Sequence, residues 1–377
     1  MLLYFVSSAL LLLIYCIGIF TGNLRYRKRI YIILSFILFF VILAFRNDYA
    51  TDYVNYVRAY LQYGQMANTN GFFYYLLPAH FGEGLEKGFV YLCIIVYKIF
   101  RNPIFLFIFC ALITLIPLWK FFDELFAEPS SFLIAVFFYI TIGTYYEGFN
   151  VMRQMMAASI SLIGFRYMIE KKYIKYLISI GVAALFHSSA LVLAVSYFLV
   201  VPNRNITISK VKKFFLWVFG IVVIFSINIL TQYYISYFRG GRLSYVQGIE
   251  QVSWKNIIFP LIIYFVCKLI ESYNKRRCGI VDMASEYGLS FEICSNSAAL
   301  WIILEICCIF VPLSTRFASY YSPFFIAYVT YTFEKISPLN KKFLTWFLII
   351  LFFGLRLYLA RNNQLMNNYS VMFGAYY

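Results

Sequence analysis

The sequence predicts an all-α, polytopic membrane protein, on the evidence of its composition and the length of its apolar runs. Of the 377 residues, 63% are hydrophobic and only 13% are charged, and the mean hydropathy is +0.76. Soluble domains contain about 45–50% apolar residues. Here the apolar residues form runs of about 16–20, a length that crosses a bilayer as a helix. We expect about 11–13 helices in a single membrane domain, residues 1–377, embedded in a lipid bilayer.

Basic clusters between the apolar runs predict the orientation of the chain. Cytoplasmic loops of membrane proteins carry an excess of Lys and Arg. Such clusters stand at 25–29, 171–175, 204–213, 275–277 and 335–342. Placing all of them in the cytoplasm puts the N-terminus and the C-terminal tail outside. The net charge of +16 then reflects orientation, and we expect no nucleic-acid partner.

The first half of the chain has one apolar run too many for this topology. Its expected spans are Leu2–Phe20, Ile30–Phe45, Ile104–Trp119, Phe132–Tyr146 and Val151–Ile169. Leu2–Phe20 lacks a basic leader and a small-residue cleavage site, so we expect a retained span. A crossing by Gly88–Phe100 would leave the next basic cluster on the wrong side. That run is short and carries Lys98, so we predict an interfacial or half-inserted helix within an outer segment, 46–102.

In the second half, the run Tyr173–Val201 lies between two inner clusters and must cross an even number of times. We predict a re-entrant-like hairpin of two short helical arms whose tip lies near Phe186–Ser189. A polar tip at membrane depth requires a cavity around it. One long tilted span is the alternative. The remaining expected spans are Phe214–Leu230, Ile257–Ile270, Ala298–Pro312, Phe317–Phe333 and Phe343–Ala360, with Ser272–Ser297 as a solvated inner connector.

The cysteines and histidines do not form a recognisable metal or disulfide pattern. Six of the eight cysteines lie in apolar runs, where a free cysteine behaves as a small hydrophobe. There are only two histidines and no CxxC pair, and neither a Walker loop nor GxSxG nor HExxH occurs. We therefore expect no metal and no cofactor.

Polar residues gather at the expected outer ends of the spans, most densely from Arg46 to Tyr56. Ionisable groups at membrane level usually mark substrate paths or chemistry. Others on this side are Glu86, Glu147, Arg153, His187, Arg239, Arg242 and Arg316. Each has a second interpretation. A lone arginine can extend to headgroups, Asp48 or Asp52 can cap a helix, His187 can be a packing residue, and Arg239–Arg242 can be a flexible turn instead of a phosphate clamp.

Five polar motifs follow one another along residues 45–325. They are Arg46-x-Asp48-x3-Asp52-Tyr53-x2-Tyr56, Glu86-Lys87-Gly88-Phe89, Asn150-x2-Arg153-Gln154-x2-Ala157, Phe186-His187-x-Ser189-Ala190-Leu191 and Ser314-Thr315-Arg316-Phe317-x2-Tyr320. In order and spacing this set resembles the EpsG-like group of Wzy-type O-antigen and exopolysaccharide polymerases. The sequence departs from the group at Ala50. A glycine is expected there, as the first residue of a Gly-Thr-Asp-Tyr pattern.

The resemblance implies a glycosyltransferase of the bacterial inner membrane that makes O-antigen, capsular polysaccharide or exopolysaccharide. Such an enzyme moves the growing glycan from undecaprenyl pyrophosphate to the next lipid-linked repeat unit at the outer, periplasmic face. The resemblance also implies a fold similar to lipid-dependent, GT-C-like glycosyltransferases, no metal, and a chain-length regulator and a flippase as partners. A lipid-linked glycan ligase or another lipid-dependent glycosyltransferase is the alternative, and a flippase or transporter is a more distant one.

The candidate residues fit this chemistry. A pyrophosphate leaving group needs cations, and the arginine fork suits phosphate. The candidate substrate- and pyrophosphate-binding residues are Arg46, Arg153, Arg316, Tyr53, Tyr56, Gln154, Tyr320, Arg239 and Arg242. The attacking sugar hydroxyl needs a positioned base. Asp52, Glu86 and His187 are the catalytic candidates, and the sequence does not choose between them. We expect Tyr49, Tyr53 and Tyr56 to form a sugar-facing wall.

Overall fold

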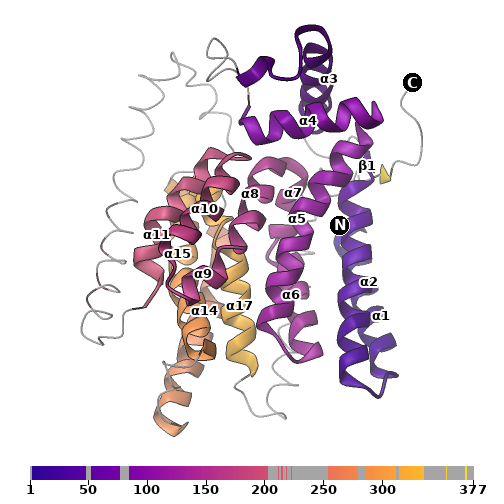
Figure 1. Ribbon diagram of the computed structural model, residues 1–377. Coiled ribbons are helices and arrows are strands. Elements are labelled where there is room, and N and C mark those ends of the chain that lie inside the picture. Colours follow the sequence, from indigo (N-terminus) through magenta and orange to yellow (C-terminus); the bar gives the residue numbers. More distant parts are fainter. Residues whose placement is uncertain are drawn as a thin grey trace. The chain divides into compact units, whose positions relative to one another are not determined.

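The computed structural model describes residues 2–47, 52–76, 85–202, 254–278, 286–310 and 314–334, with single positions at 211, 214, 218, 222, 354, 370 and 371. Most of the described residues are helical, so the predicted all-α, polytopic class is confirmed (Figure 1). Apart from single positions, the predicted spans Phe214–Leu230 and Phe343–Ala360 lie outside the described residues. The chain divides into two compact units, the first made of Met1–Phe165, Lys175–Leu191 and Leu348–Tyr377, the second of Arg166–Ile174 and Val192–Phe347.

Three long helices pack on one another in series in the first unit. Helix α1 (Leu2–Ile19) is followed by α2 (Leu24–Ala44), which packs against α1 and against α5 (Ile104–Leu125). The Trp119 indole of α5 donates a 3.0 Å hydrogen bond to the Ser35 hydroxyl of α2. Lys28 and Asp123 form an ion pair at 2.6 Å, which places the start of α2 and the end of α5 at one end of the unit. This is the end that the sequence predicts to be cytoplasmic.

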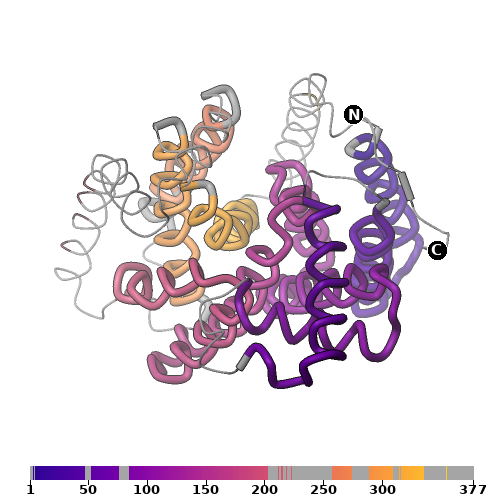
Figure 2. The backbone as a smooth tube through the Cα atoms, turned by 90° about the horizontal axis from the view of Figure 1, so that it is seen from above, coloured from indigo at the N-terminus to yellow at the C-terminus, as the bar shows by residue number. Residues whose placement is uncertain are grey.

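Two helices lie across the opposite end of the first unit. They are α3 (Tyr53–Asn70) and α4 (Lys87–Phe100), which pack on each other and run crosswise to α2 and α5 (Figures 1 and 2). A side chain at Gly64 of α3 would clash with the Tyr97 ring of α4, so the two helices approach closely. A short 3-10 turn, η1 (Tyr74–Leu76), follows α3. The crosswise course of α4 agrees with the predicted non-spanning helix at Gly88–Phe100.

The two spans predicted at Phe132–Tyr146 and Val151–Ile169 each consist of two helices separated by a break. The first comprises α6 (Pro129–Thr141) and α7 (Thr144–Asn150), which meet at a bend of 50°. Gly143 has a φ of +98° there, a conformation that ends a helix. The second comprises α8 (Met152–Leu162) and α9 (Phe165–Ile169). Gly164, between them, packs so tightly on Ser179 that a larger residue would clash.

The run Tyr173–Val201 forms the predicted hairpin. Its arms are α10 (Tyr173–Ala184) and α11 (Val192–Val200), separated by the 3-10 turn η3 (Ser188–Leu191). The Tyr173 ring at the start of α10 lies 4.9 Å from the Tyr197 ring near the end of α11, so the chain doubles back. The alternative of one long tilted span is therefore wrong.

In the second unit, the predicted solvated connector Ser272–Ser297 is wrong for most of its length. Helix α14 (Trp254–Cys278) and helix α15 (Glu286–Phe310) cover it at both ends. Glu292 lies inside this unit and is only 6% exposed. Small polar residues such as Ser295 and Asn296 allow α15 to pack closely, which is how small residues act between membrane helices. Helices α16 (Thr315–Ala318) and α17 (Ser322–Glu334) divide the predicted span Phe317–Phe333.

A small strand pair is an addition that the all-α prediction did not contain. Strand β1 (Arg46–Asn47) pairs antiparallel with β2 (Ser370–Val371), with Arg46 opposite Val371. The pair places a C-terminal segment beside the end of α2.

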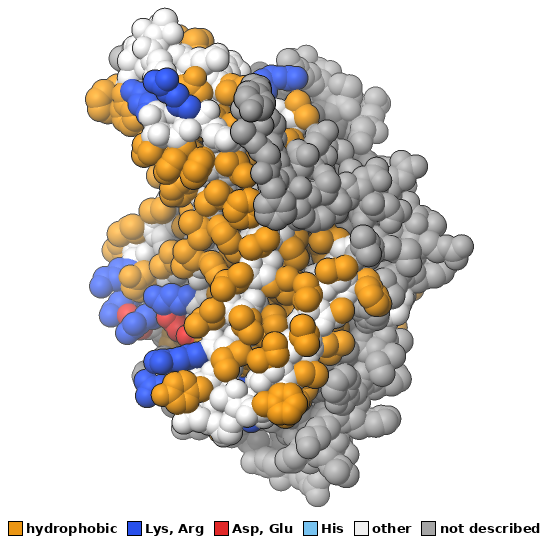
Figure 3. Space-filling view, turned by 90° about the vertical axis from the view of Figure 1, so that its right-hand side faces the viewer, with side chains coloured by type: hydrophobic (Ala, Val, Ile, Leu, Met, Phe, Trp, Pro, Cys, Tyr) orange, Lys and Arg blue, Asp and Glu red, His pale blue; other side chains and the backbone are white. Residues whose placement is uncertain are grey.

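Apolar surface and helix length both support a membrane protein. Among the described residues, two helices, Ile104–Leu125 and Gly288–Cys308, are long and apolar enough to cross a bilayer, or three if the bent α6–α7 pair is one span. On the side shown in Figure 3, apolar side chains gather over a broad part of the described surface. On α1 and α2 the exposed apolar side chains include Phe5, Leu13, Ile33 and Ile37. Apolar surface of this extent marks contact with a membrane or a partner.

Candidate functional site

Three separate segments of the first unit meet at Arg153. Arg153 lies in the first turn of α8, and its guanidinium forms an ion pair with Glu86, the residue that precedes α4. It also lies 5.9 Å from the centre of the Phe89 ring. The two side chains of the pair are 21% and 20% exposed. The pair is therefore packed on protein but still accessible from outside.

The tip of the α10–α11 hairpin supplies the third segment. The backbone N–H of Ser188 donates to the second carboxylate oxygen of Glu86 at 3.2 Å, and the Ser188 hydroxyl lies 3.4 Å from the same oxygen. One residue beyond Lys87, the Gly88 N–H donates a 2.8 Å hydrogen bond to the Leu185 carbonyl. A Cβ at Gly88 would lie only 2.6 Å from that carbonyl oxygen. Glycine at this place lets the hairpin tip reach Glu86.

His187 lies at the same tip, and Ser189 orients its ring. The Nδ1 atom of His187 is 2.8 Å from the Ser189 hydroxyl and accepts from the Ser189 N–H at 3.3 Å. The charge of His187 also acts on Glu86. The Phe186-His187-x-Ser189 motif is thus a local turn that brings an imidazole close to the Glu86–Arg153 pair.

Helix α3 contributes Tyr56 and Asp52. The Tyr56 hydroxyl donates to the Asn150 carbonyl at 3.1 Å and forms hydrogen bonds with Arg153. Asp52 occupies the N-cap position of α3 but makes no capping hydrogen bond with its side chain, which accepts a long 3.5 Å bond from Asn55. The capping interpretation of Asp52 is therefore not supported by the side-chain geometry. The charge of Asp52 acts on Tyr56, which places the carboxylate near this cluster.

The electrostatics of the cluster favour an ionised Glu86 and a neutral Tyr56. Burial alone raises the pKa of Glu86, but the Arg153 charge, backbone N–H donors that include Ser188, and His187 together bring the pKa below its ordinary value of 4.5. Burial raises the pKa of the Tyr56 hydroxyl, and Asp52 adds to the rise while Arg153 opposes it. At neutral pH Glu86 is a carboxylate and Tyr56 is a hydrogen-bond donor.

Arg46 is a buried residue and not a headgroup-seeking one. Its side chain is 2% exposed and donates to the Gly148 carbonyl at 3.0 Å and to the Met152 sulfur at 3.3 Å. The guanidinium lies 4.9 Å and 5.2 Å from the ring centres of Phe107 and Phe149. The snorkelling interpretation of Arg46 is wrong. Instead, Arg46 connects β1 to the start of α8, one residue before Arg153.

The expected sugar-facing wall is not present in the described residues. Tyr53 stacks on Phe107 with ring centres 4.8 Å apart, and Tyr56 packs edge-on against Phe89 at 5.7 Å. Both rings are buried, and so is Gln154 on α8. Tyr49 lies outside the described residues. The tyrosines of α3 form a core between α3, α4 and α5, because a helix with tyrosine every three or four residues buries that face.

The remaining candidates are two residues of the second unit and two that lie outside the described residues. Arg316 is partly exposed in α16, and Tyr320 is buried just after it, both in the second unit. Arg239 and Arg242 lie outside the described residues, so neither a turn nor a clamp is visible there. Sequence reasoning missed the parts played by Ser188 and Gly88. A polar Ser188 beside His187 and a glycine two residues after Glu86 were the available signals.

Comparisons with known proteins identify one family. The model of the EpsG family matches residues 29–371, which include every described residue of the cluster. Comparisons with curated proteins and with solved structures gave no match. Among the described residues, no group of three or more His, Cys, Asp or Glu is arranged to hold a metal ion.

Proposed function

Because the chain belongs to the EpsG family, we propose that it is a membrane glycosyltransferase that polymerises polysaccharide repeat units. Its substrate is an oligosaccharide carried on undecaprenyl pyrophosphate, and it works at the outer face of the bacterial inner membrane. The observation that carries this proposal is the Arg153 guanidinium, which Glu86 and Tyr56 hold in place while a fifth of its side chain remains exposed. A fixed, accessible arginine suits a phosphate ligand through its planar fork.

In the proposed reaction, a hydroxyl of the acceptor sugar attacks the anomeric carbon of the donor glycan. The bond between that carbon and the pyrophosphate oxygen breaks, and the pyrophosphate lipid leaves with the electron pair. Arg153 stabilises the negative charge that develops on this leaving group. The hydroxyl proton passes to a protein base, and attack from the opposite side inverts the configuration. Arg316 is the second arginine expected to bind pyrophosphate, and its own substitution tests that role.

Among the three candidate bases, the surroundings of Glu86 fit a positioning role best. A general base works best when its pKa lies near the operating pH. Arg153 and Ser188 hold both oxygens of Glu86 and keep its pKa low. Asp52 and His187 therefore remain the candidates for proton removal. When each is replaced in turn, only the variant that lacks the true base should lose the acid limb of the pH–rate profile.

The decisive experiment uses a host strain from which the chain is deleted. We expect single repeat units to persist and long polysaccharide to disappear, and we expect restoration by the parent chain but not by Arg153→Ala. A glycan ligase would instead leave polymer accumulated on its lipid carrier after deletion. Unchanged polymer length in the deletion strain would overturn the proposed function.

A further inference from the structure

The carboxylate of Glu86 does not bond the helix that it precedes. Glu86 occupies the N-cap position of α4, where side chains such as Asp, Asn or Ser accept from the first N–H groups of a helix. Its side chain makes no such bond and takes the Arg153 guanidinium and the Ser188 N–H instead. The direction of this carboxylate therefore depends on how the backbone is held at the start of α4.

Two backbone hydrogen bonds flank Glu86. On one side, the Leu85 N–H donates to the Tyr63 hydroxyl of α3 at 3.1 Å. On the other side, the Gly88 N–H donates to the Leu185 carbonyl of the hairpin at 2.8 Å. The main chain at Glu86 is thus tied to α3 before the residue and to the hairpin after it. Each bond favours one position of this backbone by its net free energy.

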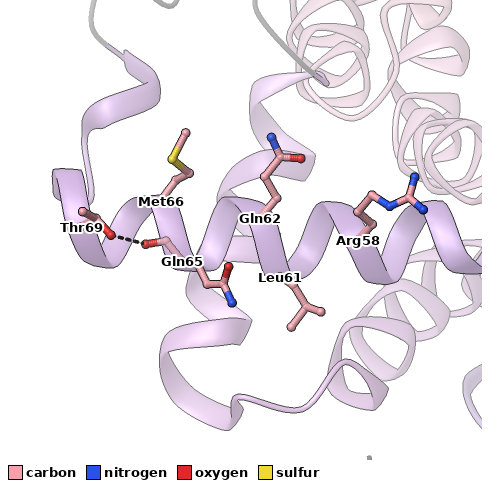
Figure 4. Close-up of a pocket in the computed structure, with 6 residues that line it drawn as sticks. All are labelled: Arg58, Leu61, Gln62, Gln65, Met66 and Thr69. Atoms are coloured by element: carbon pink, nitrogen blue, oxygen red, sulfur yellow. Dashed lines mark hydrogen bonds between the residues drawn. The ribbon is translucent and has the colours of Figure 1, made fainter.

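Helix α3 brings tyrosines to both partners of the ion pair. Tyr56 bonds Arg153, and Tyr63 holds the residue before Glu86. Seven residues return a helix to nearly the same side about 10 Å further along, which is the spacing of these two tyrosines. The charges of Arg153 and Glu86 both act on the Tyr63 hydroxyl, so it lies close to the pair. The other, exposed side of α3 is the one drawn in Figure 4, with Arg58, Leu61, Gln62, Gln65, Met66 and Thr69.

Tyr60 lies between these two tyrosines and differs from Tyr63 in its hydroxyl. Both rings are buried. Tyr63 packs edge-on against Tyr75 with ring centres 5.1 Å apart, and Tyr60 packs in the same way on Tyr97 at 5.4 Å. The Tyr60 hydroxyl is buried and has no hydrogen-bond partner among the residues that the structure describes. Removal of either hydroxyl keeps the ring in place, whereas the change at Tyr63 also removes a hydrogen bond. Tyr60→Phe is therefore the matched control for Tyr63→Phe.

We propose that Tyr63 is a positioning residue of the candidate site. By accepting from the Leu85 N–H, it holds the backbone from which Glu86 directs its carboxylate to Arg153, and the ion pair in turn fixes the guanidinium. Tyr63 itself takes part in no chemical step. Its effect on polymerisation rests on the proposed function, whereas its effect on the Glu86–Arg153 pair does not.

The first test separates turnover from substrate binding. Membranes that contain each full-length variant are supplied with the lipid-linked repeat unit over a range of concentrations. We expect Tyr63→Phe to lower the turnover at saturation by about three- to tenfold, the value of one net hydrogen bond. The half-saturating concentration should stay unchanged, since the charge that Arg153 stabilises develops only in the transition state.

The same assay in a Glu86→Gln background shows whether Tyr63 acts through Glu86. There, Tyr63→Phe should lower turnover by less than about twofold, because two changes that act through one contact are not additive. Tyr60→Phe should leave turnover unchanged in either background.

The second test follows the ion pair without measuring activity. Arg153 helps to keep the pKa of Glu86 below its ordinary value of 4.5, and the resulting stability is lost as the pH falls through the folded pKa. A carboxylate that is held less well has a pKa nearer to the ordinary value, so the folded state loses less stability in acid. We expect the melting temperature of purified Tyr63→Phe to fall less than that of the parent from pH 7 to about pH 3.5. Tyr60→Phe should follow the parent.

The outcomes separate this inference from the proposed function. A smaller loss of stability in acid, together with a fall in turnover that Glu86→Gln suppresses, supports the positioning role of Tyr63. Parental turnover or a parental acid profile for Tyr63→Phe overturns it, because Tyr63 then does not act through Glu86. Additive losses in the Glu86→Gln background, or the same behaviour of Tyr60→Phe, overturn it as well. Polymer that persists in the deletion strain overturns the proposed function and leaves the acid profile to decide the role of Tyr63.

Discussion

Arg153 owes its position to groups that are distant in the sequence. Glu86 precedes α4, Tyr56 comes from α3, and Ser188 holds Glu86 from the hairpin tip. A single arginine beside a carboxylate is otherwise a weak indication of function, because surface ion pairs are common and contribute little. What distinguishes this pair is that both partners are mostly buried and have further partners of their own.

The first prediction concerns the fork of Arg153. Arg153→Lys keeps the charge but cannot bond Glu86, Tyr56 and a phosphate in the same plane. We expect the rate of polymerisation to fall by about 10- to 100-fold, the value of one charge-assisted hydrogen bond. Membranes supplied with the lipid-linked repeat unit give the rate. Lys120→Ala, which removes a cation that is largely exposed on α5, should leave the rate unchanged. A fully active Arg153→Lys variant would contradict the role of the fork.

The second prediction concerns pH and Glu86. The folded state lowers the pKa of Glu86 below its ordinary value of 4.5. A lowered carboxylate pKa stabilises the folded state above the unfolded pKa, and this contribution is lost as the pH falls through the folded pKa. We expect the melting temperature to change little from pH 7 to about 5 and to decrease below about 4.5. The variant Glu86→Gln should melt at a lower temperature near pH 7 and lose less stability in acid. Identical pH profiles for parent and variant would argue against the ion pair.

At the scale of secondary structure, Gly88 controls how the hairpin tip meets α4. A Cβ on Gly88 would lie 2.6 Å from the Leu185 carbonyl oxygen, so the tip has to move in Gly88→Ala. The third prediction is that Gly88→Ala weakens the Glu86–Ser188 contact. We expect it to cost about 1–3 kcal/mol of folding free energy and to slow polymerisation. Thermal unfolding and the membrane assay measure the two effects. Gly181→Ala on α10 is the control, since nothing lies within 4 Å of its added methyl group. Equal behaviour of the two variants would show that the tip is not held in this way.

The hairpin and the crosswise α4 could be predicted because each follows from counting crossings between basic clusters. The break at Gly143 could not, since Phe132–Tyr146 is largely apolar and the backbone angle of one glycine divides it. The burial of Glu292 was also missed. Its neighbours are small and polar, which suits a solvated loop as well as a closely packed helix.

The structure brings two of the predicted charged residues together and buries two of the predicted tyrosines. Polarity at a span end was enough to select Arg153 and Glu86, which the structure brings together. From the sequence alone, Tyr53 and Tyr56 fit a sugar-facing wall and an aromatic core equally well. Their spacing on α3 is the helical repeat of a buried face, and the partners Phe107 and Phe89 come from other helices.

At the scale of the molecule, the two ends of the first unit differ in character. One end carries the Lys28–Asp123 pair and the basic residues at the start of α2. The other carries α3, α4, the β1–β2 pair and the Arg153 cluster (Figure 1). Since basic residues mark the cytoplasmic side, we expect the cluster on the outer side. A lipid-linked saccharide that is displayed outside the cell membrane would then meet it directly.

The last prediction tests this orientation with single cysteines introduced at the two ends. Gln65 is exposed on α3, and Arg25 is exposed in the first turn of α2. In intact cells, a membrane-impermeant maleimide should label Gln65→Cys and should label Arg25→Cys only after the membrane is permeabilised. The native Cys16 is exposed and is replaced by serine in both variants, because its labelling would obscure the result. The reverse pattern would place the Arg153 cluster in the cytoplasm, where the acceptor hydroxyl and the pyrophosphate donor of an outer-face polymerase could not reach it.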